Sequence, residues 1–438
     1  MSPRWRQTRY LPLAADVAGL ALALGGLGLT LRQLAAGIGQ PSDFTAYYLA
    51  ARAHALGLDY YRRETLEALA AAAGLSGDLG PYLYPPLFAA ALGPLAVLDY
   101  VLARWVWLGL SLGCLAAGLL LLRTAAGLRL GAGWRGPALA FVACFPPLAD
   151  DLLKGQVTAL LLLLLAGAWY AHRRERPYLA GTLVALAAWI KLAPALLLVY
   201  FALRRDWRGV AAGAVTTVGL LVLSLLAAGP APHLSYFTQT VPTIGLQIGA
   251  AANVSLPGLV ARLFAPGPLN APLVPDAGLY LGGLALGLSG TTGAFVWVSL
   301  TQPGPAARDR LGYAFAIVTL LLLTPSSRAY TLVLALIPLA ALFACFHEAG
   351  QPNWRVFDLL VVVLLLLSVP PDLRLDPLAA MQLGLQASPP PVLLALISAL
   401  PTAGLVTLAI ALLRASPADA TRATGYGLRA APAARVSE

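Results

Sequence analysis

The chain consists of apolar runs joined by short polar connections. About twelve runs occur in the 438 residues, at 13–31, 104–122, 136–149, 156–171, 178–190, 192–203, 209–228, 278–300, 311–323, 330–346, 356–369 and 391–413. Helices are the structures that satisfy every backbone hydrogen bond inside lipid without closing into a barrel. We therefore predict an all-α polytopic membrane protein, a bundle of about 12 transmembrane or part-crossing helices. A full crossing needs ~20 residues, so we expect the shorter runs to surround a water-filled cavity.

Basic clusters indicate which helix ends face the cytosol, because cytosolic loops carry an excess of Lys and Arg. The clusters are Arg4/Arg6/Arg9, Arg123/Arg129/Arg135, Arg173/Arg174/Arg176, Arg204/Arg205/Arg208, Arg308/Arg310, Arg355 and the tail after Arg414. They predict cytosolic N- and C-termini and three external segments, at 32–103, 229–277 and 370–390.

Two of these clusters flank a single apolar block, residues 178–203, and both are expected on the cytosolic side. The block therefore has to fold back as a hairpin. Proline interrupts helices, so the segment from Lys191 to Pro194 is the natural turn. This predicts Lys191 at the external tip of the hairpin.

Composition agrees with a membrane protein and excludes a soluble enzyme. Hydrophobic residues make up 59% of the chain and charged residues 11%, and the mean hydropathy is +0.77. Soluble proteins have about 25% charged residues. The net charge of +10 comes from the excess of basic residues in the cytosolic segments, so we expect a membrane partner and no nucleic acid.

Cysteine and histidine patterns give no indication of a metal or redox site. Cys114, Cys144 and Cys345 lie in apolar runs without metal-ligand spacing, and the four histidines are scattered. The chain also lacks a Walker motif, a dinucleotide fingerprint and a zinc-protease motif. We therefore predict no cofactor, a single membrane domain over residues 1–413, and a disordered cytosolic tail at 414–438.

The first external loop, about residues 32–103, contains the best candidate for chemistry. Pro41 and Ser42 indicate the start of a helix lying at the membrane surface, with Ser42 as N-cap and Asp43 in the first turn. Asp43 could complement the helix dipole or act in catalysis. Farther along, Tyr84 precedes a second predicted surface helix at 86–98 and could anchor the interface or line a sugar pocket.

Other polar groups are predicted at the same external face. The chain has only two lysines, Lys154 and Lys191, and both are expected at external helix tips. Cations at the rim of a cavity suit a lipid-linked phosphate, although Lys154 could equally form a local ion pair with Asp150 or Asp151. Ser327-Arg328 joins two late runs at this face.

A last external motif, Asn253-Val-Ser255-Leu-Pro, precedes a helix that contains Arg262. It has the form of a glycosylation sequon, and it also suits a structural turn at the start of that helix.

Several motifs, taken in order, resemble glycosyltransferase family 87. They are Ser42-Asp43-Phe44 with Tyr47-Tyr48 and Arg52, Leu58-Asp59-Tyr60-Tyr61, Tyr84-Pro85-Pro86-Leu87, Gly155-Gln156-Val157-Thr158, Ile190-Lys191-Leu192-Ala193-Pro194 and Asn253 to Gly258 ahead of Arg262. The resemblance covers about residues 40–345. One departure concerns the segment at Ser327-Arg328, where family members often carry an aromatic residue and a histidine.

This resemblance implies a GT-C membrane glycosyltransferase of the bacterial cell envelope, located in the plasma membrane. It implies transfer of a sugar, typically mannose, from a polyprenyl phosphate to a glycolipid or glycan acceptor on the outer face, with inversion and with Asp43 as general base. Candidates for binding the donor phosphate are Lys191, Arg328, Lys154, Arg262 and Arg52, and candidates for the sugar and acceptor pocket are Tyr47, Tyr84, Gln156 and Asn253. No metal is required, because fixed cations can stabilise the phosphate.

Two other interpretations remain open. A transporter or flippase of a lipid-linked sugar would also need many helices and a polar cavity, but transporters place charges near the membrane midplane. Here the polar residues gather at one face, which favours an enzyme. The second alternative is a transferase of the same class that uses another sugar, such as arabinofuranose or glucose.

Overall fold

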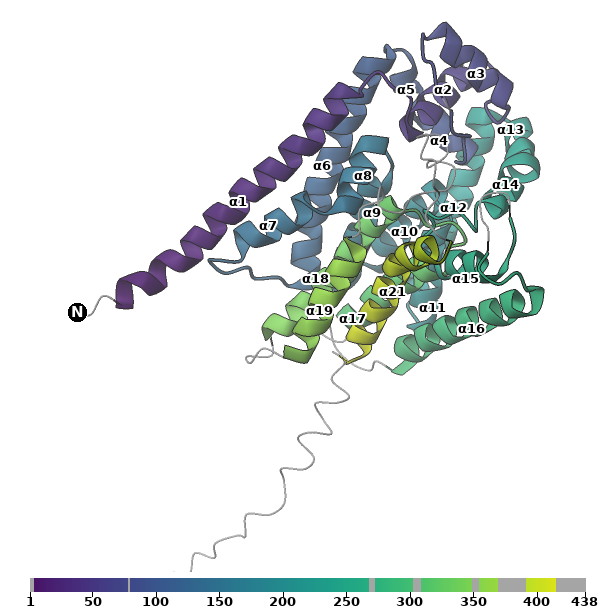
Figure 1. The fold of residues 1–438 in the computed structure, drawn as a ribbon. Coiled ribbons are helices and arrows are strands. Elements are labelled where there is room, and N and C mark those ends of the chain that lie inside the picture. The colour runs from purple at the N-terminus through teal and green to yellow at the C-terminus, as the bar shows by residue number, and fades with distance from the viewer. Residues whose placement is uncertain are drawn as a thin grey trace, which may run out of the picture.

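The computed structural model describes residues 4–77, 79–267, 272–301, 309–348, 354–368 and 391–414. Helices dominate these residues, as predicted, and every apolar run that lies in the described ranges is helical (Figure 1). The long elements are α1 (Arg4–Ala36), α6 (Tyr100–Ala126), α9 (Thr158–Arg173), α10 (Pro177–Ile190), α12 (Trp207–Ala228), α16 (Ala277–Thr301), α17 (Asp309–Leu323), α18 (Leu336–Glu348), α19 (Trp354–Leu367) and α21 (Pro391–Arg414). The expected tail at 414–438 lies almost wholly outside the described residues.

The predicted number of crossings, about 12, is not confirmed. Five described helices are long and apolar enough to span a bilayer, within α1, α6, α12, α16 and α21. A sixth span forms if α7 (Arg135–Ala143) and α8 (Pro146–Lys154), bent by 48° at their junction, are counted together. The remaining apolar runs form shorter helices, because the number of apolar residues in a run does not fix how far the helix continues.

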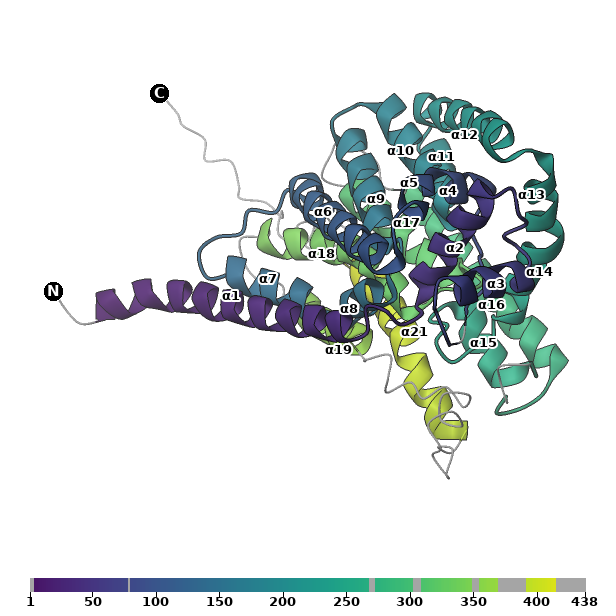
Figure 2. The ribbon, with the colours of Figure 1, turned by 90° about the horizontal axis from the view of Figure 1, so that it is seen from above.

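Helix α7 packs along α1 at the edge of the molecule (Figure 2). The two backbones meet at Gly19 and Gly136, where a Cβ atom on Gly136 would lie 2.1 Å from the Asp16 carbonyl oxygen. The carboxylate of Asp16 accepts hydrogen bonds from the backbone N–H groups of Gly133 (2.8 Å) and Gly136 (2.9 Å). Asp16 therefore binds the otherwise unsatisfied amides at the start of α7.

The predicted hairpin is confirmed. Helix α10 ends at Ile190, and the chain continues through a short 3₁₀ turn (η1, Ala193–Ala195) into α11 (Leu196–Leu203). At the other end of the block, His172 Nδ1 lies 3.5 Å from Asp206 Oδ2, so the two basic clusters are neighbours. Lys191 lies at the tip, between the two apolar helices.

The bundle has two chemically different ends. The helices of the first loop, α2 (Asp43–Ala55), α3 (Arg63–Ala72), α4 (Pro86–Ala91) and α5 (Gly93–Ala96), gather at one end (Figures 1 and 2). The predicted surface helix at 86–98 is thus two short helices, separated at Leu92. The basic ends of α6, α9 and α17 lie at the opposite end, since these helices run between the two ends.

The remaining described elements follow α12 and complete the end that holds the first loop. They are α13 (Pro230–Ser235), a π-helical turn (Tyr236–Thr240), α14 (Val241–Leu246), α15 (Leu256–Phe264) and a 3₁₀ segment η3 (Ala329–Ala335).

Close backbone contact between α10 and α12 generates a prediction about stability. A Cβ atom on Gly181 would lie 1.9 Å from the Gly209 carbonyl oxygen, as in membrane helices that pack through small residues. Gly181→Ala should lower the free energy of unfolding by about 1–3 kcal/mol through overpacking. Thermal unfolding of the purified protein in detergent measures this change. Gly219→Ala is the matched control, because Gly219 on α12 faces open space; equal losses in both variants would contradict the packing argument.

Candidate active site

The start of α2 holds Asp43 in a fixed place. Ser42 is the N-cap, as predicted, and its backbone N–H donates to the Thr45 hydroxyl at 2.8 Å. The Thr45 hydroxyl also shares a hydrogen bond of 2.8 Å with the hydroxyl of Tyr100 on α6. Phe44 is fully buried beside Trp107, with ring centroids 5.7 Å apart. Asp43 is thereby held at a rigid helix start and remains partly exposed.

A tight turn after α8 brings Gln156 to Asp43. Gly155 adopts a left-handed conformation (φ 66°), and the Gln156 backbone N–H returns to the Asp151 carbonyl oxygen at 2.9 Å. This is the usual way in which a glycine ends a helix. The turn buries Gln156, and its Nε2 donates a hydrogen bond to Asp43 Oδ2.

Two tyrosines fix the orientation of the Gln156 amide. The hydroxyls of Tyr47 (3.0 Å) and Tyr84 (3.1 Å) both donate to Gln156 Oε1, and the two hydroxyls lie 2.8 Å apart. Since Oε1 accepts from both tyrosines, Nε2 is the end of the amide that faces Asp43. The structure therefore brings together four residues that the sequence analysis selected, Asp43, Tyr47, Tyr84 and Gln156.

The two lysines of the chain lie over the same ring, that of Tyr330 in η3. Lys191 Nζ is 4.9 Å from the ring centroid and Lys154 Nζ is 5.6 Å away. Lys191 also lies 5.9 Å from the ring of Tyr84, which connects it to the Gln156 network. Lys154 forms an ion pair with Asp150 at 2.9 Å. Lys191 has no carboxylate within 4.0 Å in the part of the chain that the structure describes.

The surroundings of Lys191 weaken its hold on its proton. Burial lowers the pKa of Lys191 to about 8, and the charge of Arg328 acts in the same direction, while the carboxylates of Asp151 and Asp43 oppose the shift. Asp151 is fully buried, and its Oδ1 accepts a hydrogen bond from the Thr158 N–H at 3.2 Å. At this end of the bundle, Lys191 is therefore a cation that a bound anion would strongly stabilise.

Arg328 lies at the same end, on the segment that joins α17 to η3. It pairs with Asn253 in an isolated antiparallel bridge, and its Nη2 donates to Gln247 Oε1 at 3.0 Å. Because Gln247 is neutral, the charge of Arg328 is not cancelled by this bond. Its charge acts on both Lys191 and Tyr330.

Asn253 has a structural function in this arrangement. Its Nδ2 donates to the carbonyl oxygens of Ile248 and Pro325, both at 2.8 Å, and its Oδ1 accepts from the N–H groups of Ser255 and Ser327. The side chain is fully buried. These four bonds join two loops, in agreement with the structural turn considered for this motif.

Two of the candidate cations are not part of the cluster around Asp43. Arg262 is buried and donates to the carbonyl oxygens of Ala250, Asn253 and Ser398. Arg52 donates to the Tyr48 hydroxyl at 3.2 Å, and it lies nine residues beyond Asp43, about 13 Å along the helix.

Sequence reasoning gave no role to Asp151 or Tyr330, although both belong to the site. The only signal for Asp151 was its place in an acidic pair near Lys154, a pattern that equally suggested a local ion pair. Tyr330 had no signal beyond its place after Arg328, since its importance comes from two lysines distant in sequence.

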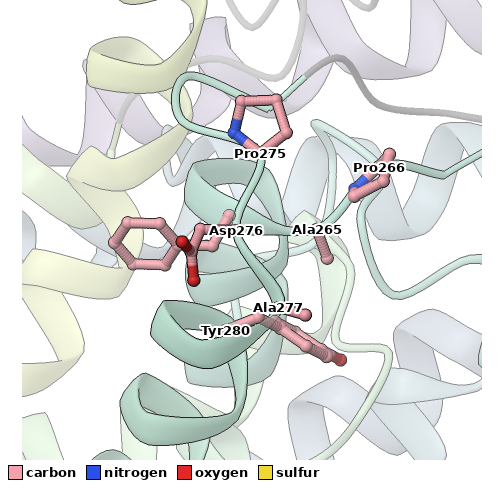
Figure 3. A pocket seen from close by; sticks show the side chains of 7 residues that line it. Ala265, Pro266, Pro275, Asp276, Ala277 and Tyr280 are labelled. Carbon is pink, nitrogen blue, oxygen red and sulfur yellow. The ribbon is translucent and has the colours of Figure 1, made fainter.

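A separate cavity of about 270 Å³ lies where α15 leads into α16 (Figure 3). Its lining includes Phe264, Pro266, Pro275, Asp276 and Tyr280. Asp276 Oδ1 accepts a hydrogen bond from the Leu279 N–H at 2.8 Å and so caps α16. This mainly apolar cavity contains none of the groups around Asp43. Within the described ranges, no group of three or more His, Cys, Asp or Glu side chains is placed to hold a metal ion.

The Asp43 cluster combines two chemical capacities. A partly exposed carboxylate, oriented by an amide, can accept a proton from a hydroxyl group. Cations within the same cluster can stabilise negative charge that develops on a phosphate. Together these capacities suit the transfer of a group from a phosphate to a hydroxyl.

Comparison with known proteins agrees with this chemistry. The chain is 30% identical over 255 residues to a polyprenol-phosphate-mannose-dependent alpha-(1-2)-phosphatidylinositol pentamannoside mannosyltransferase of Mycolicibacterium smegmatis, covering 56% of this chain and 57% of the relative. It is 26% identical to the protein of that name in Mycobacterium tuberculosis (66% and 64%), and 27% identical to an alpha-(1->3)-arabinofuranosyltransferase of Corynebacterium glutamicum (50% and 49%). The chain thus covers less than two thirds of the length of these relatives.

No solved structure matches the chain. The family model described as Glycosyltransferase family 87 matches residues 82–326. Since this match extends over more than half of the 438 residues, the chain belongs to glycosyltransferase family 87.

Proposed function

We propose that the protein transfers a sugar, with mannose as the first candidate, from a polyprenyl phosphate to a hydroxyl group of an acceptor at the outer face of the plasma membrane. One observation carries this proposal. The network of Gln156 and Tyr84 has a carboxylate, Asp43, hydrogen-bonded to Gln156 and a cation, Lys191, over the ring of Tyr84. A proton acceptor and an anion-stabilising group are thereby held in one rigid unit.

In the proposed reaction Asp43 is the general base. Asp43 removes the proton from the acceptor hydroxyl while the hydroxyl oxygen forms a bond to the anomeric carbon. The bond between that carbon and the phosphate oxygen breaks, and its electron pair leaves with the polyprenyl phosphate. A single displacement of this kind inverts the anomeric centre. The hydrogen bond from Gln156 holds the carboxylate in one orientation during the transfer.

The departing phosphate would be stabilised mainly by Lys191 and Arg328. A sugar phosphodiester has one negative charge, and the released polyprenyl phosphate acquires a second. Cations placed where charge develops lower the transition state more than the ground state. Lys154 contributes less, because Asp150 already neutralises it at 2.9 Å. The proposal therefore assigns this role to side chains and not to a metal or another cofactor.

The proposed placement in the membrane is supported by the difference between the two ends of the bundle. We assign the end with the basic clusters to the cytosol, together with both termini, because positive residues are retained on that side. The Asp43 end then faces outward. A polyprenyl donor keeps its chain in the bilayer and its sugar at the surface, where it meets a glycolipid or glycan acceptor.

The printed names of the relatives support the donor class. Two of the relatives are named as dependent on polyprenol-phosphate-mannose, and a third is named as an arabinofuranosyltransferase. A transferase that uses a different sugar is therefore the second candidate. A flippase has less support, because the carboxylate and the cations of the candidate site, Asp43, Lys191 and Lys154, lie together at one end of the bundle.

Replacing Asp43 tests the general base. Asp43→Asn should lower kcat by about 10²–10⁴-fold, because an amide cannot accept the proton, while the fold persists. The measurement is transfer of labelled mannose from purified polyprenyl-phosphate mannose, with thermal unfolding to check the fold. Glu64→Gln removes an exposed carboxylate from the same loop and should leave turnover unchanged. Near-wild-type turnover of Asp43→Asn would exclude this role.

The pKa of Lys191 predicts how donor binding depends on pH. Lys191 is cationic below a pH of about 8 and loses its charge above it, so the KM for the donor should rise as the pH increases through that range. Lys191→Arg should abolish this increase, because arginine stays protonated. Measuring the KM for the donor across that pH range in both proteins tests whether Lys191 is the titrating group. The same increase in the arginine variant would show that another group titrates.

Tyr330 should act through its ring. Tyr330→Leu removes the aromatic face below both lysines and should raise the KM for the donor between about twofold and 30-fold, as expected for loss of cation–π contacts. Tyr330→Phe keeps that face and should stay close to the wild type. Equal losses in both variants would point to the hydroxyl group instead.

A further inference from the structure

A buried arginine on α6 is not explained by the chemistry described so far. Arg104 is 2% exposed and lies on a helix that can span the membrane. Within the described part of the chain, no carboxylate lies within ion-pair distance of it. A buried charge without a counterion costs several kcal/mol. The hydrogen bonds of Arg104 have to offset part of this cost.

The hydrogen bonds of Arg104 go to the end of α8. Its Nη2 donates to the carbonyl oxygens of Leu152, at 3.2 Å, and of Leu153. One turn later on α6, Trp107 Nε1 donates to the Gly155 carbonyl oxygen at 2.8 Å. These carbonyls belong to the C-terminal end of α8, where carbonyl oxygens lack the usual donor four residues farther along. The Leu152 carbonyl also accepts from the Gly155 N–H at 3.2 Å. Helix α6 therefore fixes the turn from which Gln156 extends.

Arg104 also contacts the element that holds Asp43. Its Cζ lies 5.4 Å from the centroid of the Phe44 ring, and Phe44 is the residue after Asp43. On its other side, a Cβ atom at Gly155 would lie 1.6 Å from Arg104 Nη1. The guanidinium thus fills the space between the neighbour of Asp43 and the neighbour of Gln156.

We propose that Arg104 is a positioning residue, which sets the distance and orientation between Asp43 and Gln156. The proposal rests on the proposed function, because it assumes that this hydrogen bond orients the general base. The position between the end of α8 and the Phe44 ring suits a planar group with several hydrogen-bond donors. Lysine ends in a compact ammonium group on a flexible stem, so it lacks the rigid planar fork that donates to the α8 carbonyls while the guanidinium carbon lies over the Phe44 ring.

A double-mutant cycle tests this proposal. Arg104→Met should lower kcat between about tenfold and 100-fold, the size expected for small misplacements, with little change in the KM for the donor. Arg104→Lys should recover only part of the loss. In a Gln156→Ala background, Arg104→Met should have less than about twofold effect, because the bond it positions is already gone.

A buried arginine at the opposite end of the bundle, Arg310 on α17, provides the control. Arg310→Met should lower the unfolding temperature and change kcat by the same factor with and without Gln156. If the losses from Arg104→Met and Gln156→Ala simply multiply, Arg104 has only a structural role and the proposal is wrong. If the wild-type protein transfers no sugar, or Asp43→Asn is fully active, the proposed function itself is wrong, so the two failures are distinguishable.

Discussion

The hydrogen bond from Gln156 to Asp43 connects the two halves of the site, and much of the surrounding structure serves to form it. Asp43 begins a helix whose first turn is bonded to Tyr100 through Thr45. Gln156 follows a left-handed turn at Gly155, where a side chain would crowd Arg104 and Phe44. The side-chain amide of Gln156 could flip by a half turn if nothing distinguished its oxygen from its nitrogen. The hydroxyls of Tyr47 and Tyr84 remove that freedom by binding its oxygen.

Around this bond, opposite charges are kept apart by aromatic rings. Lys191 lies between the rings of Tyr84 and Tyr330 and away from a direct ion pair. Rings hold an ammonium group without cancelling its charge, so Lys191 remains available to an anion. Lys154 shows the contrasting situation, since Asp150 neutralises it.

Much of the fold follows from local patterns in the sequence. Apolar runs predicted the helices. The two basic clusters around residues 178–203 predicted the hairpin and the position of Lys191 at its tip, because two clusters expected on the same side of the membrane require the block between them to fold back. The motifs of the first loop and the Gly155-Gln156 pair predicted residues that do come together. The number of crossings was not predictable, since helix lengths depend on tertiary packing.

The supporting residues of the site could not be predicted for a related reason. Arg104 and Tyr330 act on partners about 50 to 180 residues away in sequence, and nothing local distinguishes them from an ordinary basic or aromatic residue. Asn253 and Arg262 show the converse. Their motif was visible, but their hydrogen bonds go to backbone groups of neighbouring loops, which a pattern of residue types does not reveal.

The most direct test of this account is to follow a labelled sugar and its lipid carrier together. Purified protein in liposomes would be given polyprenyl-phosphate mannose, labelled in the sugar, with a glycolipid acceptor in the outer leaflet. We expect the label to move to the acceptor, with one polyprenyl phosphate released for each sugar transferred. Label that crosses the bilayer while still attached to its polyprenyl phosphate, without any transfer, would contradict the account and indicate a transporter.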